Sequence, residues 1–270
     1  MNTELETNTA NHKISAKTRF SIVAVALVAF MGILAETSLN VTFPTLEKTF
    51  GLPLSTVQWV TTAYLLVVAI VMPTSSYISQ RFQNRTLFFS GLIFFTLGDL
   101  LSLISPNFTI LMAGRLIQGI GTGIAIPLMF NLVLTKIPRE RVGLWMGFAG
   151  MILSIAPALG PTYGGLLTGT LGWRMIFAII LIIPICLFPL GAWAIEKSEK
   201  IRPGKFDFIA FIFLSLVMTS ALLALDSLSS AQFSWIWLVV FILGLIAFIW
   251  RSKTSTLNFI DIDVFKSPTF

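Results

Sequence analysis

Eight stretches of this sequence are apolar over a length that can cross a lipid bilayer, and this pattern limits the possible fold more than any other feature. A transmembrane helix needs about 20 mainly apolar residues. The apolar runs cover residues 20–43, 57–79, 86–105, 108–134, 143–168, 174–195, 207–226 and 233–250. Charged residues make up 11% of the chain, whereas a soluble domain carries about 25%. The sequence therefore predicts an all-α, multi-pass membrane protein with eight spans.

The basic residues indicate how these spans are oriented. Most Lys and Arg residues outside the spans fall in alternate connections, within residues 13–19, 81–85, 136–141, 197–205 and 251–266. Connections rich in Lys and Arg face the cytoplasm, so we expect both termini to be cytoplasmic in a plasma (cell) membrane. This distribution accounts for the net charge of +6, so the expected partner is the lipid bilayer and not nucleic acid.

Residues for metal binding and nucleophilic chemistry are scarce. The chain has one cysteine, Cys186 in the middle of a span, and one histidine, His12 in the polar tail 1–19. A disulfide framework and a thiolate metal site need more cysteines than the chain has. The place of the histidine in the polar tail excludes a His-based metal site and a Ser–His–Asp triad. We therefore predict no catalytic residues, no metal and no cofactor, and hence a protein that is not an enzyme.

Three ionisable side chains, Glu36, Asp99 and Arg115, lie inside the apolar runs. Each costs roughly 2.5 kcal/mol or more at the centre of a bilayer. A helical rise of about 1.5 Å per residue places all three at a similar depth. We expect Arg115 to hold a carboxylate through bidentate bonds, and the acid to change protonation state when the Arg moves away. The alternative is a static ion pair that only fixes helix packing.

Polar residues share one face on each of two predicted spans. Glu36 and Asn40 lie one turn apart on the first span, and Arg115, Gln118 and Thr122 share a face of the fourth. We expect both faces to point inward and to line a substrate cavity. Asn and Gln also join helices in membranes without any further role, which is the alternative for these two side chains.

The fifth predicted span carries small residues at every fourth position, namely Ala156, Gly160 and Gly164. Such a stripe lets two helix backbones approach closely. Pro157 and Pro161 remove backbone donors and should bend the helix. We therefore predict a bending interface between two halves of a larger protein, with ordinary small-residue packing as the alternative.

Several of these segments resemble motifs of the major facilitator superfamily, specifically the EmrB/QacA type of drug:proton antiporters with fourteen spans. The segment from Glu36 to Pro44 is similar to the first-span motif D-x-T-x-x-N-x-A-x-P, with Glu in place of Asp. The segment 114–121 matches R-x-x-Q-G-x-G, whose Arg is implicated in proton transfer. Trp59 and Tyr64 fit the second span of this family.

Two further motifs carry the resemblance to different degrees. Gly160, Pro161, Gly164 and Gly165 match the antiporter signature G-P-x-x-G-G, although Ala156 stands where a Gly is expected. The cytoplasmic gate loop between the second and third spans keeps its basic residues, represented by Arg81 and Arg85. Its acidic position is occupied by Gln80, so the acid on which the usual cytoplasmic gate of this family relies is missing.

The resemblance implies a domain organisation. It comprises a cytoplasmic tail over 1–19, a six-helix transporter bundle over 20–195, a cytoplasmic linker over 196–206, and two extra helices over 207–250. Residues 251–270 would begin the connection to a C-terminal six-helix bundle that the chain lacks, and we expect this chain alone to confer no efflux.

The function implied by the resemblance is proton-coupled efflux of hydrophobic or cationic drugs, driven by the proton gradient. Glu36 would be the proton-responsive acid, Arg115 would tune it, and Asp99 would share the charge network. A nutrient or metabolite facilitator of the same fold is one alternative. A truncated, non-transporting membrane remnant or partner subunit is the other.

Overall fold

The structure, a computed structural model, describes residues 14–196, 207–229 and 235–254, which form helices and connecting turns without any β-strand. Eight of the described helical segments are long and apolar enough to cross a membrane. This confirms the predicted all-α class and the number of spans.

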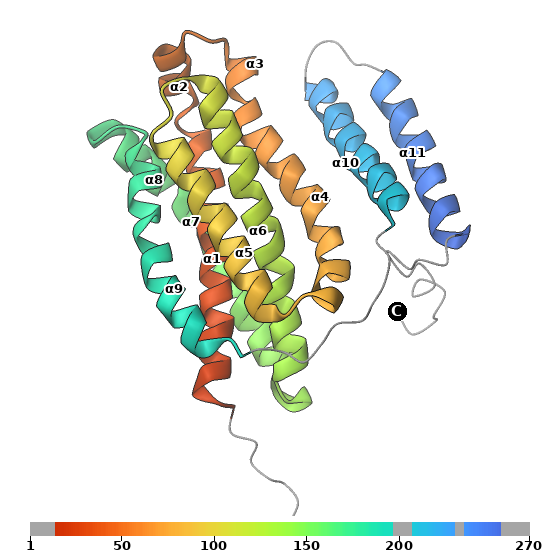
Figure 1. Cartoon of the computed structure of the whole chain (residues 1–270). Coiled ribbons are helices and arrows are strands. Elements are labelled where there is room, and N and C mark those ends of the chain that lie inside the picture. Colours follow the sequence, from red (N-terminus) through yellow and green to blue (C-terminus); the bar gives the residue numbers. More distant parts are fainter. Residues whose placement is uncertain (1–13, 197–206, 230–234, 255–270) are drawn as a thin grey trace, which may run out of the picture.

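The first six spans form one bundle (Figure 1). They comprise α1 (Ala16–Asn40), α4 (Trp59–Arg81), α5 (Asn84–Leu103), α6 (Phe108–Lys136), α7 (Arg139–Thr170), and the consecutive helices α8 (Met175–Ile180) and α9 (Ile182–Ala194). The helices α6 and α7 extend past the predicted ends of their apolar runs, because polar and charged residues continue a helix beyond the hydrocarbon region. The predicted first span is too long by three residues, since α1 already ends at Asn40.

A short amphipathic helix, α2 (Phe43–Phe50), covers one end of this bundle and leads into α3 (Leu54–Val57). Leu46 is fully buried, and the Phe50 ring lies 5.9 Å from Trp173 and 6.0 Å from Phe108 between ring centroids. The helix ends at Gly51, whose φ of 64° is a conformation that glycine adopts without strain. Sequence analysis predicted no helix here, because the segment is too short to span.

Glycines bring the neighbours of α6 into close contact with it. Gly98 of α5 faces the α6 backbone at Gly114, and Gly91 faces Gly121. On another side of α6, Gly119 lies against Tyr64 and Val67 of α4. Since a Cβ atom at these positions would press on a neighbouring backbone or side chain, the glycines permit helix separations that larger residues exclude.

The last two spans, α10 (Phe208–Ser229) and α11 (Trp235–Thr254), form an antiparallel pair beside α4 (Figure 1). Asp207 accepts a hydrogen bond from the Ala210 backbone N–H at 3.0 Å and forms an ion pair with Arg251 at 3.1 Å. It therefore caps the start of α10 and ties it to the end of α11.

Candidate functional site

Arg115 is the central residue of the candidate site, and its side chain is fully buried on α6. Its Nη1 donates a hydrogen bond to Gln118 Oε1, and its Nε donates to the Val60 carbonyl oxygen at 3.4 Å. The guanidinium carbon lies 3.9 Å from the centroid of the Tyr64 ring. The positive charge is therefore surrounded by a side-chain amide, a backbone carbonyl and an aromatic face, all of which are neutral.

Asp99 on α5 is also fully buried and is linked to Arg115 through Gln118. The Gln118 side-chain nitrogen donates to Asp99 Oδ1 at 2.9 Å, while its oxygen accepts from Arg115. The predicted bidentate bond from Arg115 to a carboxylate is wrong, since among the described residues the only ion pair is Asp207 with Arg251. Gln118 lies one helical turn after Arg115 and occupies the space between the two charges.

Two atoms of this network have no hydrogen-bond partner although they are buried, namely Asp99 Oδ2 and Arg115 Nη2. A buried polar atom without a partner costs about 1–3 kcal/mol, and more when it belongs to a charged group. Such atoms are rare in folded proteins and often mark functional groups. The arrangement is consistent with side chains that exchange partners.

Glu36 lies on α1, half-buried, and interacts electrostatically with Arg115 without contacting it directly. Asn40 lies one turn later on the same face of α1. Asn40 accepts a hydrogen bond from Thr61 of α4 at 3.1 Å, although its own side chain is exposed. The polar face of α1 is therefore directed toward α4, and its position close to Arg115 agrees with the predicted common depth.

Sequence analysis missed the part of Tyr64 in this network. Its hydroxyl donates to Thr122 Oγ1 at 2.9 Å, and Thr122 fits against Gly32 of α1. Tyr64 thus connects α4 to α6 and, through Thr122, to the helix that carries Glu36. A polar-tipped aromatic side chain in an otherwise apolar run is the signal that could have identified it.

The small-residue stripe of α7 packs against α1 beside Glu36. Gly160 lies against Thr37, and Gly164 lies against the backbone of Ser38. This stripe therefore faces a neighbour within the same bundle and not a second half, which corrects the predicted interface. Ala156 is fully buried on the same face. The neighbouring Pro161 and Gly165 are exposed.

The predicted gate-loop residues lie away from this network, near the turn between α4 and α5. Arg81 donates to the Tyr77 hydroxyl at 2.9 Å, and the Arg85 guanidinium carbon lies 5.9 Å from the centroid of the Phe89 ring. No described contact joins either of them to Arg115, and their role as a gate stays a prediction.

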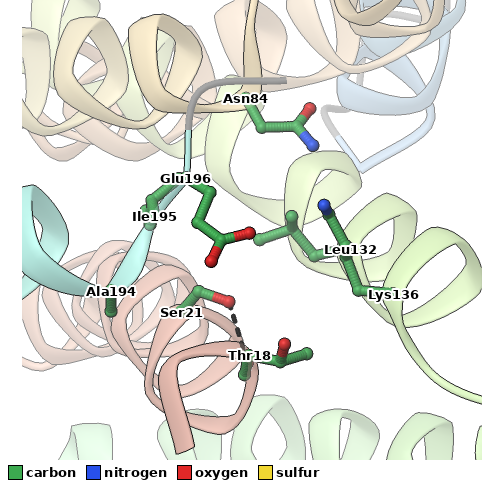
Figure 2. Close-up of a pocket in the computed structure, with 8 residues that line it drawn as sticks. All are labelled: Thr18, Ser21, Asn84, Leu132, Lys136, Ala194, Ile195 and Glu196. Atoms are coloured by element: carbon green, nitrogen blue, oxygen red, sulfur yellow. Dashed lines mark hydrogen bonds between the residues drawn. The ribbon is translucent and has the colours of Figure 1, made fainter. Parts of the chain in front are cut away.

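A small polar pocket occupies the same end of the bundle, where α1, α5, α6 and α9 meet. Figure 2 shows the Glu196 carboxylate and the Lys136 ammonium group directed into it from opposite sides. The remaining lining residues are Thr18, Ser21, Asn84, Leu132, Ala194 and Ile195. The pocket contains none of the buried charges, so it is separate from the candidate site.

Sequence comparisons place this chain among transport proteins. A family model described as Major Facilitator Superfamily matches residues 25–262. The lincomycin resistance protein LmrB of Bacillus subtilis is 34% identical over 92% of this chain and 53% of its own length. LmrB of Listeria monocytogenes is 36% identical over 92% of this chain and 54% of its own length. A multidrug resistance protein B homolog of Mycobacterium tuberculosis is 31% identical over 74% of this chain and 37% of its own length.

A solved structure shares the fold at low sequence identity. The crystal structure of a peptide transporter POT in complex with sulfate superposes with a TM-score of 0.60 at 14% identity, over 92% of this chain and 53% of that protein. At this identity the match supports the fold alone. The chain spans about half the length of the curated relatives it matches.

Proposed function

Because the chain belongs to the Major Facilitator Superfamily, we propose that it supplies the proton-coupling half of a transporter that exports drug-like compounds in exchange for protons. The family consists of membrane transporters and not of enzymes, as the sequence predicted. Relatives named for lincomycin and multidrug resistance support export of drugs. The coupling to protons is our own step beyond those names.

The observation that carries this proposal is the buried chain from Arg115 through Gln118 to Asp99, with Glu36 on the adjacent helix. Two acids and one guanidinium interact in an apolar surrounding, where an uncompensated charge is costly. When both acids are ionised, the group has one negative charge in excess. One proton or one cationic substrate neutralises that excess, so the two compete for the same site, as exchange requires.

This competition favours hydrophobic or cationic substrates. Binding a cation displaces a proton from the acids, and proton uptake on the other side of the membrane releases the cation again. Such exchange draws energy from the proton gradient and needs no bound cofactor. A facilitator of the same fold would carry its substrate down a gradient and would need no acid that changes protonation.

We further propose a plasma-membrane location with both termini in the cytoplasm. The concentration of Lys and Arg in alternate connections supports this orientation. It places the α2 end of the bundle outside the cell and the Lys136 end inside. Substrates would reach a site that this chain shares with a second six-helix half, as the length of the relatives suggests.

The decisive experiment replaces Glu36 in a transporter completed with a second six-helix half. We expect Glu36→Gln to abolish efflux of a fluorescent cation such as ethidium that depends on the proton gradient, while membrane insertion is retained. Glu47→Gln is the matched control, because Glu47 lies on α2 away from the buried charges. Gradient-driven efflux at the native rate in Glu36→Gln would refute the proposed coupling.

A further inference from the structure

Arg115 lies on the face of the Tyr64 ring, although two acids are near it. Tyr64 is 1% exposed, and its hydroxyl bond to Thr122 fixes the ring in place. The face of an aromatic ring carries negative potential and attracts a guanidinium, most strongly when water is excluded. Gly119 lets the α4 backbone approach α6 at this level, which brings the ring within reach.

Each helix packed around Arg115 contributes the groups that it can interact with. They are Glu36 from α1, Tyr64 from α4 and Asp99 from α5. Tyr163 from α7 faces Asp99 and not Arg115. Tyr163 donates its hydroxyl to the Ile176 carbonyl oxygen at 2.9 Å, so it is already engaged elsewhere. Within this part of the chain Arg115 pairs with no carboxylate, and the Tyr64 ring is the aromatic face that it contacts.

We propose that Tyr64 is a positioning residue that holds Arg115 apart from Glu36 and Asp99 while these acids are protonated. When one of them gives its proton to water, the carboxylate attracts Arg115 away from the ring. When the acid takes up a proton again, Arg115 returns to Tyr64. This inference deepens the proposed function, because it assigns the competing partner that controls when Arg115 binds an acid.

The physical reason is a difference in charge dependence. The attraction between the ring and the guanidinium does not depend on the protonation of the acids, whereas the attraction of an acid for Arg115 exists only after the acid is ionised. If the ring attracts the guanidinium less strongly, Arg115 can therefore pair with a carboxylate at lower pH. The strength of the attraction between the Tyr64 ring and Arg115 then sets the pH at which the acids titrate.

The test uses the 270-residue chain in lipid nanodiscs and follows the infrared carbonyl band of protonated carboxyl groups during a pH titration. Loss of components in Glu36→Gln and Asp99→Asn assigns the band. Tyr64→Phe keeps the aromatic ring. Fluorinated phenylalanines at position 64 keep the shape of the ring and reduce the negative potential on its face. We expect the titration midpoint to fall stepwise with fluorination, by about one pH unit for three fluorines.

Phe95 provides a matched control, since it is a buried aromatic residue on α5 that packs against Gly121. The same fluorination there should leave the midpoint unchanged. Tyr64→Leu should lower the midpoint at least as far as the trifluorinated ring, and the fluorinated series decides the question if this variant does not fold. A midpoint that ignores fluorination at position 64, or follows it equally at position 95, would overturn the role of Tyr64.

The titration is independent of transport, so the two proposals can fail separately. If the midpoint falls with fluorination at position 64 but the protein shows no proton-driven efflux, the proposed function is rejected and the role of Tyr64 is kept. If efflux is proton-driven but the midpoint does not change with fluorination at position 64, only the role of Tyr64 is rejected.

Discussion

Gln118 determines how the buried charges meet, because it separates Arg115 from Asp99 by one side-chain amide. The sequence predicted that the two charged residues lie at a similar depth. It could not show that the amide would lie between the charges, since this depends on rotamers and on the close approach of Gly98 to α6. The same limit explains why the contact of Tyr64 with Arg115 was not predicted.

Replacing the amide by an acid should convert the bridge into a direct ion pair. In Gln118→Glu the new carboxylate accepts charge-assisted hydrogen bonds from Arg115, and Asp99 loses the donor to its Oδ1. We expect a folded protein in which Arg115 no longer leaves its partner, and proton-driven ethidium efflux at least about tenfold slower in the completed transporter, as befits a loss of about 1.4 kcal/mol or more.

Gln118→Leu is the companion variant, because it removes the bridge without adding a charge. It leaves further buried atoms of Arg115 and Asp99 without partners, which costs about 3 kcal/mol or more in total. Thermal unfolding in detergent should separate the two variants, with Gln118→Leu melting well below Gln118→Glu. A Gln118→Leu variant that melts at the temperature of the native protein would show that the amide has no bridging role.

At the level of the helix, α7 presents two faces with different tolerance for added volume. Gly164 lies against the Ser38 backbone, whereas a Cβ atom at Gly165 would meet nothing within 4 Å. The repeat of small residues predicted a close approach of two helices. It could not identify the partner helix, because small residues do not specify which helix packs against them. The structure assigns that partner as α1.

This difference gives a paired stability prediction. Gly164→Ala should destabilise the bundle by about 1–3 kcal/mol, since α1 and α7 must move apart beside Glu36. Gly165→Ala should be neutral or stabilise by up to about 1 kcal/mol, because alanine favours the helix and its Cβ would clash with no neighbour. The midpoint of thermal unfolding in detergent measures both, and a larger loss in Gly165→Ala would contradict the packing of α7 on α1.

For the whole molecule, the bilayer made the eight spans predictable. A helix that satisfies its own backbone in hydrocarbon needs a long apolar run, and each such run in the sequence corresponds to a helix or helix pair in the structure. The short helix α2 was not predictable on this basis. It is stabilised by Phe50 and Leu46 packing onto the bundle end, a tertiary effect without a length requirement.

The proposed orientation can be tested through the single cysteine of the chain. In a Cys186→Ser background, Thr49→Cys on α2 should react with a membrane-impermeant maleimide in intact cells, because this residue is exposed at the α2 end. Thr135→Cys, exposed at the far end of α6, should react only after permeabilisation. The reverse pattern would invert the topology and would move the α2 end to the cytoplasm.

The two ends of the six-helix bundle are held together in different ways. At the α2 end, the rings of Phe50, Phe108 and Trp173 meet, and Arg174 donates to the Ser105 carbonyl oxygen at 2.7 Å. At the Lys136 end, the helices surround a small polar pocket. Thermal fluctuations should therefore be largest at the Lys136 end. Amide hydrogens there will exchange with deuterium before those at the α2 end, which the three aromatic rings cover.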